Sequence, residues 1–162
     1  MAGEISTAGV VIKYAPEATV NVRPTTGYQT KATGATLDIN QYVTGASGLS
    51  ADYELYDVTT LSDTLRHRFI KGLLGNDGNI SLSCNINPTS RSDWNAIVTE
   101  FEALTGGLGM WFEFTLPGDT QSFFIRGEPT MMLFPDIETA QAVQGAVSII
   151  ENDSAAWAAK ST

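Results

Sequence analysis

The side chains that most often carry catalysis are scarce in this sequence. Its 162 residues include one histidine, His67, and one cysteine, Cys84. No Ser-His-Asp arrangement is supported, and neither a Gly-x-Ser-x-Gly nucleophile motif nor a Gly-rich phosphate loop ending in Lys-Ser/Thr occurs. A zinc site would have to be built mainly from carboxylates, which is uncommon. We therefore predict no enzyme activity, no metal site and no cofactor.

Three groups of polar residues have both a chemical and a structural interpretation. Glu113 and Glu128 could face each other across strands as a glycosidase-like pair, but 18 acidic residues offer such pairs in any sheet. Asn76-Asp77-Gly78 suggests a calcium loop, yet the carboxylates required downstream are missing. Arg66-His67-Arg68 is a small basic patch that we expect to be solvated or paired with acidic residues of a neighbour. The structural interpretation is favoured for each group.

Composition narrows the class of protein. The length predicts one domain with enough residues to bury a core, and 43% apolar residues with 17% charged ones indicate a globular chain. The net charge of −9 and the lack of a basic tract argue against a gene-regulatory DNA binder. We expect no secretory signal and no membrane anchor, because Met1 to Glu4 precede no apolar core and no apolar run approaches the ~20 residues that a membrane helix needs. A single cysteine favours folding in the cytoplasm.

The elements that must position these residues are a set of strands and one long helix. Ile80 to Ile86 alternates apolar and polar residues, which predicts a strand with Cys84 in the core as a small buried hydrophobe. Ser90 is predicted to cap a helix over Arg91 to Leu104, with Asp93 in its first turn and Gly106-Gly107 as its stop. Its apolar residues form one stripe that must pack on a sheet: Trp94, Ile97, Val98, Phe101 and Leu104.

Other segments are predicted from β-branched content, alternation and turn residues. The expected strands are 9–14, 19–23, 35–39, 64–70, 109–116, 121–126, 129–134 and 142–151. Gly75-Asn76-Asp77-Gly78 and Pro117-Gly118-Asp119 are expected to be hairpin turns, and 129–134 is expected to pair with 142–151. The predicted fold class is mainly β with one helix, as two packed antiparallel sheets in a sandwich or half-barrel.

Residues 40–63 show no strong period and are predicted to be a long central loop. Loops of this length in compact domains are usually functional or disordered. This one carries Tyr42, Tyr53 and Tyr56, and tyrosine is favoured at interfaces. A solvated loop fits these side chains poorly unless a partner covers some of them.

Several stretches, in this order, resemble the tail tube (major tail) proteins of long-tailed, non-contractile bacteriophages. They are Asp57-Val58-Thr59-Thr60-Leu61-Ser62-Asp63, Ile70-Lys71-Gly72-Leu73, Asp77-Gly78 with the strand to Asn85, the helix with its aromatic stripe, the hairpin tipped by Gly118-Asp119, and a last strand ending near Glu151. The resemblance covers residues 40–151. Lys71 stands where relatives often have proline, and Ile86 where they often have tyrosine.

The resemblance implies a structural virion protein whose partner is itself. Six subunits are expected to join their sheets into one ring barrel, and the rings to stack into a tube that conducts double-stranded DNA during ejection. The stacking contacts are assigned to Tyr42, Tyr53, Tyr56 and the run from Asp57 to Asp63. Tail tip and terminator proteins are further implied partners, and the implied location is the phage tail, after assembly from the host cytoplasm. The domain is assigned to residues 1–151 and a C-terminal arm to 152–162.

Two alternatives remain open at this point. A ring protein of a secretion or contractile apparatus would share the fold and the ring but not the long stacking loop. A β-sandwich carbohydrate-binding module would need a solvent-exposed aromatic platform, whereas most aromatic residues here fit buried stripes.

Overall fold

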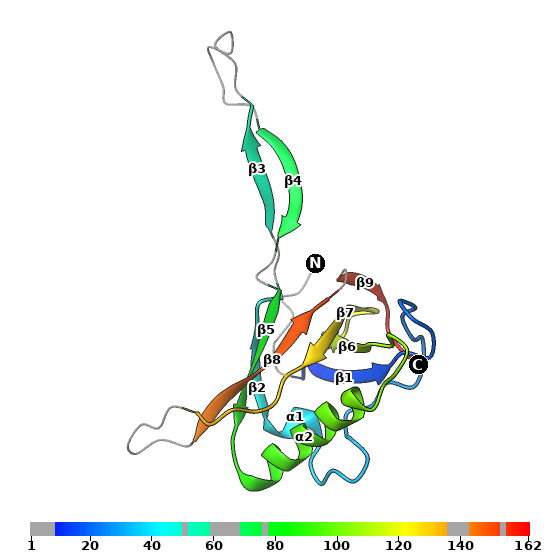
Figure 1. Cartoon of the computed structure of the whole chain (residues 1–162), viewed down its shortest axis with the longest axis vertical. Helices are drawn as coiled ribbons and strands as arrows, with labels where there is room; N and C mark the ends of the chain where they lie inside the picture. Colours follow the sequence, from blue (N-terminus) through cyan, green and yellow to red (C-terminus); the bar gives the residue numbers. More distant parts are fainter. Residues whose placement is uncertain (1–8, 50–51, 59–68, 76–77, 136–142, 153–154) are drawn as a thin grey trace.

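The computed structural model describes residues 9–49, 52–58, 69–75, 78–135, 143–152 and 155–162. In chain order its elements are β1 (Val11–Pro16), α1 (Ile39–Tyr42), β2 (Val43–Ser47), β3 (Asp52–Asp57), β4 (Phe69–Gly75), β5 (Asn79–Asn85), α2 (Pro88–Glu102), β6 (Met110–Thr115), β7 (Gln121–Pro129), β8 (Gln144–Glu151) and β9 (Ala156–Ala159). The prediction of a mainly β fold with one long helix is confirmed, with α1 as a short additional turn (Figure 1).

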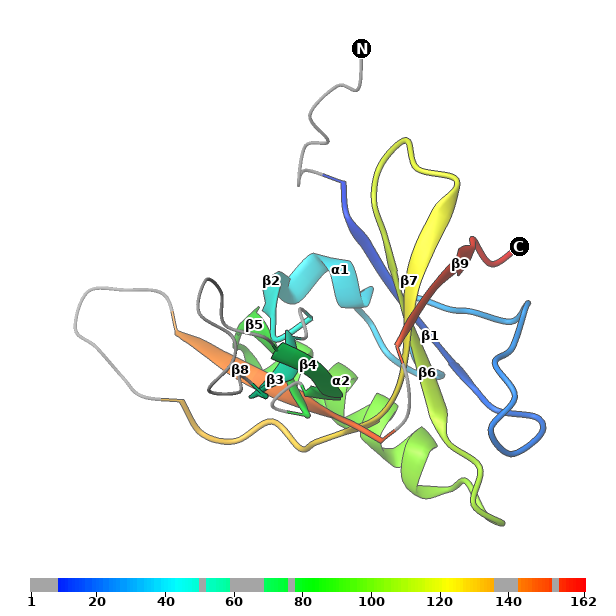
Figure 2. The same ribbon diagram turned by 90° about the horizontal axis from the view of Figure 1, so that it is seen from above.

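Seven of the strands form one open antiparallel sheet. Its order is β1-β6-β7-β8-β5-β2, and β9 pairs with β7 beside β8. The first half of β7 pairs with β9 and its last three residues pair with β8. The sheet therefore bends at β7, and Figure 2 shows β1, β6, β7 and β9 as one face and β2, β5 and β8 as the other. The result is a half-barrel.

The two faces and α2 enclose the core. Period-two alternation directs Ile80, Leu82 and Cys84 of β5 inward, as predicted, and all three are buried. Trp94 and Ile97 of the predicted helix stripe are fully buried, while Val98 and Phe101 are half-buried against the same cluster. Leu104 lies beyond the end of α2 and is half-buried.

The start of α2 differs from the prediction. Asn87, not Ser90, is the N-cap, and Pro88 occupies the first turn. The Asn87 side chain accepts from the Ser90 N–H at 2.8 Å, and the Ser90 hydroxyl accepts from the Asn87 N–H at 2.9 Å. This reciprocal capping box places Ser90 and Asp93 inside the helix.

Two carboxylates of α2, the buried Asp93 and the half-buried Glu100, hold the segment between β1 and α1. Asp93 accepts from the backbone N–H groups of Thr36 and Leu37 at 3.0 and 2.6 Å. Glu100 accepts from the Tyr14 hydroxyl at 2.8 Å and from the Thr33 N–H at 2.8 Å. These bonds satisfy a non-regular backbone around 33–37, and the strand predicted over 35–39 does not form. The strand predicted over 19–23 does not form either, because the chain turns there and the Val22 N–H donates to the Thr19 carbonyl at 3.1 Å.

Two predicted pairings and one predicted loop are also wrong. β4 pairs with β3, whereas β5 pairs with β8 on one edge and with β2 on the other, so β4 and β5 do not form the predicted hairpin. Residues 129–134 were predicted to pair with 142–151. Instead β8 pairs mainly with β5, and after Pro129 the chain leaves regular strand structure. Residues 40–63 are not one loop, because they contain part of α1 and all of β2 and β3.

Candidate functional site

The described residues offer no cluster of metal-binding side chains. No group of three or more His, Cys, Asp or Glu side chains is gathered there, and no described helix has the length and apolarity to span a membrane. The Cys84 thiol donates to the Leu82 carbonyl at 3.5 Å, and burial raises its pKa to about 11. The prediction that Cys84 is a buried core residue is confirmed.

The sheet does not bring Glu113 and Glu128 together. Glu113 of β6 lies opposite Phe124, and Glu128 of β7 lies opposite Ile150. The buried Glu113 carboxylate accepts from the Ser161 N–H at 3.0 Å and from the Ser161 hydroxyl. These bonds fasten the C-terminal segment to β6, so the predicted C-terminal arm is in fact joined to the sheet through β9 and Ser161.

A buried ion pair lies at one end of β6 and β7. The Arg126 guanidinium donates to the Glu17 carboxylate through Nε at 2.7 Å and Nη2 at 3.2 Å. Trp111 Nε1 and the Gly109 N–H also donate to Glu17, at 2.7 and 2.8 Å. A Cβ at Gly109 would lie 2.6 Å from the guanidinium, so only glycine leaves room for it. The pair ties the end of β1 to the β6–β7 hairpin and has a structural role.

Lowering the pH is expected to destabilise the fold through Glu17. Although burial alone favours the neutral acid, hydrogen bonds from Arg126, Gly109 and Trp111 outweigh it and lower the Glu17 pKa from 4.5 to about 2. The carboxylate therefore contributes stability that is complete above pH ~4.5 and is lost as the pH falls toward 2. Urea unfolding midpoints between pH 6 and 2.5 measure this loss.

Glu17→Gln is the matched variant for that titration. It keeps the size and an acceptor oxygen but cannot titrate, so its stability should fall less steeply below pH 4.5 than that of the unaltered chain. Parallel stability curves for the two chains would contradict the role assigned to Glu17.

A two-stranded hairpin, β3 and β4, projects from the half-barrel (Figure 1). Gly48 lies where the chain leaves β2 toward the hairpin. Its φ is +82°, and a Cβ there would lie 2.4 Å from the Asn79 carbonyl oxygen, so the position requires glycine. Leu55, Tyr56 and Val58 on the hairpin are 64%, 55% and 37% exposed. An isolated two-stranded hairpin is marginally stable in water, so this element fits a role in which a partner covers it.

The predicted stacking residues divide into three groups. Tyr56, Asp57 and Val58 are exposed on the projecting hairpin, where a partner can reach them. Tyr42 is only 2% exposed because α1 packs it into the core, so it is not an interface residue in this conformation. The backbone of Tyr53 lies in β3 opposite Leu74. Thr59, Thr60, Leu61, Ser62 and Asp63 lie outside the described residues, as do Arg66, His67 and Arg68.

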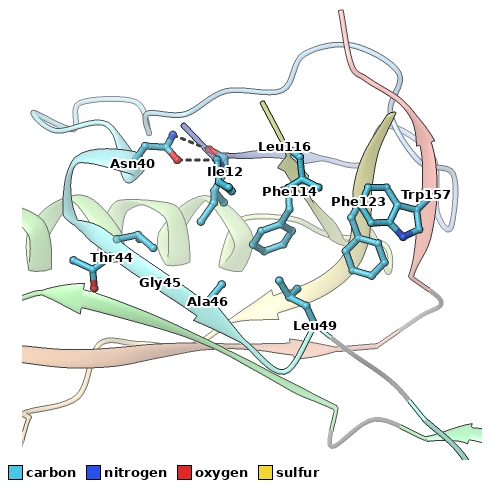
Figure 3. Close-up of a pocket in the computed structure, with 12 residues that line it drawn as sticks. Ile12, Asn40, Thr44, Gly45, Ala46, Leu49, Phe114, Leu116, Phe123 and Trp157 are labelled. Carbon is cyan, nitrogen blue, oxygen red and sulfur yellow. Dashed lines mark hydrogen bonds between the residues drawn. The ribbon is translucent and has the colours of Figure 1, made fainter. Parts of the chain in front are cut away.

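An apolar groove of about 630 Å³ opens between β2 and the face that carries β1, β6, β7 and β9. Figure 3 shows Leu49, Phe114 and Phe123 directed into this space, with Trp157 at its margin. Asn40 fixes the opposite side, because its amide binds the Ile12 N–H at 2.7 Å and the Ile12 carbonyl at 3.1 Å. None of the described residues that line the groove is charged.

The neighbouring strand β2 is an edge of the described sheet. Its sequence, Val-Thr-Gly-Ala-Ser, has no proline and no charged residue, which are the usual protections of an exposed edge. Sequence reasoning missed this edge because β2 shows no apolar alternation. It missed the groove because the lining residues come from five strands, from α1 and from adjoining loop positions. The lack of proline and of charged residues over 43–47 was the sequence feature that could have indicated the exposed edge.

Comparison with known proteins gives a likeness of fold. No family model matches the chain, and no curated protein matches it. Two solved structures are similar over 98% of this chain. One belongs to the cryo-EM structure of the cap that terminates the tube of the anti-feeding prophage, with 13% identity, a TM-score of 0.55 and 93% of that chain covered. The other belongs to the sixfold-symmetrised cryo-EM structure of the anti-feeding prophage baseplate, with 10% identity, a TM-score of 0.55 and 98% of that chain covered. The chain shares their fold.

Proposed function

We propose that this chain is a structural subunit of a phage-like tail, which assembles into rings that stack into a tube. The projecting β3–β4 hairpin is the observation that carries this proposal. It forms a sheet of its own, outside the half-barrel, and exposes Leu55 and Tyr56 to solvent. Such an element gains stability when a neighbouring subunit buries it. The likeness of fold to components of a tail-like particle supports the same role.

The open sheet supports ring formation. β1 and β2 lie at the ends of the strand order, so strands of neighbouring copies can continue the sheet on both sides. Closing such a series into a barrel removes the exposed edges. A ring of six agrees with the sixfold symmetry applied to the similar baseplate structure.

The charge of the chain suits a conduit for double-stranded DNA. A net charge of −9 disfavours phosphate contacts, so DNA can slide through the tube without salt-dependent binding. The screening length is about 10 Å at 0.1 M salt, and a negative wall therefore still acts on DNA in a narrow bore. No catalytic step is part of this proposal.

A cap or baseplate position is the second candidate, favoured by the parts of the particle to which the two similar structures belong. A subunit at either position ends or begins a tube and does not extend one. It would form single rings that do not stack.

Negative-stain electron microscopy of the purified chain, over a range of concentrations, separates these functions. Hollow tubes with sixfold end views are expected for a tube subunit, whereas single rings at every concentration would support the cap or baseplate position. Compact monomers alone, even after addition of a tail-tip complex as template, would contradict both.

A further inference from the structure

The two ends of the sheet are protected to different degrees. At the β1 end, the Asn40 side chain binds the Ile12 N–H at 2.7 Å and the Ile12 carbonyl at 3.1 Å, and Tyr14 and Gln29 exchange two backbone hydrogen bonds of 2.9 Å. At the β2 end, no described backbone other than that of β5 binds residues 43–47. An unpaired strand edge is a template for a further strand. The chain therefore covers part of one end of its sheet and leaves the other end open.

A second open edge lies on β9. One side of β9 pairs with β7. This side is held firmly, because the Lys160 N–H donates to the Thr120 carbonyl at 3.3 Å and the Ser161 N–H donates to the buried Glu113 at 3.0 Å. No described strand pairs with the other side. The sequence of β9, Ala-Trp-Ala-Ala, contains no proline and no charged residue, and in this respect β9 matches β2.

The remaining edges of the described strands are less suited to pairing. Charged residues occur in both strands of the projecting hairpin, and such residues normally protect an edge. They are Asp52, Glu54 and Asp57 in β3 and Lys71 in β4. Beside β8, the Thr130 N–H donates to the Ser148 carbonyl at 2.8 Å, so the segment that follows β7 covers that edge. Among the described strands, an open edge without charged residues is thus shared by β2 and β9.

The lack of charge on these two edges matters for contacts between copies. The chain has 18 acidic and 9 basic residues, so two copies repel each other through their net charge. Edges without acidic side chains allow the closest approach of two copies. A strand added along β2 also shields the adjoining apolar groove from water, and none of the described lining residues requires a charged partner. Because the same chain provides both open edges, a second copy supplies the strand that β2 lacks.

We propose that β2 of one copy pairs with β9 of the next copy, so that their sheets become continuous. The inference rests on the proposed function and assigns the second edge of its ring contact to β9, because the β1 end is covered at Ile12 and Tyr14. In Figure 2, β2 and β9 lie toward opposite sides of the half-barrel. Each copy offers one edge of each kind, so the contact is heterologous and forms a ring when the rotation between copies closes.

A charged residue in β2 tests this pairing. Gly45→Lys is expected to raise the concentration needed for ring formation by about tenfold or more, because lysine on an edge strand opposes the formation of backbone hydrogen bonds. A Cβ at Gly45 meets no atom within 4 Å, so the thermal unfolding midpoint should not fall. Ser92→Lys is the matched control, since Ser92 is exposed on α2, and it should leave the threshold unchanged. Rings at the unaltered concentration in Gly45→Lys would overturn the inference and leave the proposed function standing.

Cross-linking identifies the partner edge. In a Cys84→Ala background, one chain carries Ala46→Cys, and a second, longer-tagged chain carries either Ala156→Cys or Val11→Cys. A short bismaleimide is expected to join the Ala46→Cys chain to the Ala156→Cys chain, and neither chain to itself. A product with the Val11→Cys chain instead, or no mixed product in preparations that contain rings, would overturn the β2–β9 contact. Failure of the unaltered chain to form any ring or tube would overturn this contact together with the proposed function.

Discussion

A chain in which residues 50–77 are replaced by a short Gly-Ser linker is expected to fold normally and to form no tubes. The hairpin is a separate two-stranded sheet, and the described residues of the core cluster all lie outside the replaced segment. β2 and β5 are antiparallel neighbours with Ser47 opposite Ser81, so a short linker can join them as a plain hairpin. The thermal unfolding midpoint should change little, while electron microscopy should show monomers or single rings.

A second variant tests the contribution of the hairpin side chains to assembly while keeping the hairpin backbone. Leu55→Ser with Tyr56→Ser keeps the strands but removes exposed apolar surface worth roughly 1.5–3 kcal/mol for each side chain when buried. It should weaken assembly in the same direction as the replacement. Tubes of normal length from the shortened chain would show that stacking does not depend on β3 and β4.

Arg126→Leu is expected to lower the free energy of unfolding by about 3–5 kcal/mol. The variant leaves the Glu17 carboxylate buried with its Trp111 and Gly109 donors but without the positive charge. Removing one partner of a buried pair costs more than removing both, because the remaining charge is uncompensated. Urea unfolding at pH 7 measures the loss.

Double-mutant analysis assigns that loss to the pair. Glu17→Gln in the Arg126→Leu chain removes the uncompensated charge and should recover part of the stability. Arg91→Leu is the control, because Arg91 is exposed on α2 and its replacement should change the free energy by no more than about 0.5 kcal/mol. A double variant as unstable as the sum of the single variants would show that the two residues act independently.

Elements with a buried apolar face were predictable from the sequence. The alternation in β5 and the 3.6-residue stripe of α2 follow directly from burial on one side, so both were placed within a few residues. The β6–β7 hairpin was found for the same reason, together with its Gly118 turn. Only the start of α2 was misplaced, because Asn87-Pro88 and Ser90 both resemble caps and the reciprocal bonds decide between them.

Elements outside the core were harder to predict. β2 and β3 carry exposed side chains, so no apolar period marks them, and residues 40–63 were assigned to a loop. Tyr56 is exposed and its assignment to an interface stays a prediction, whereas Tyr42 was assigned to an interface although the core buries it. The sequence did contain a signal for α1, because Asp38 and Gln41 have the spacing of a capping box. The Glu17–Arg126 pair joins residues 109 positions apart, and no local pattern indicates such a contact.

The pairing of β1 with β6 also sets the order in which the chain can fold. Among the described strands β1 pairs with β6, and Val11 lies opposite Thr115. During synthesis, β1 therefore cannot pair with β6 until about 100 further residues have been made. This takes roughly 5–20 s at 5–20 residues per second. During that interval its edge is open, and pairings so distant in sequence form slowly even after release. We expect high-level synthesis to favour aggregation through β1, and slower synthesis at lower temperature to increase the yield of folded subunit.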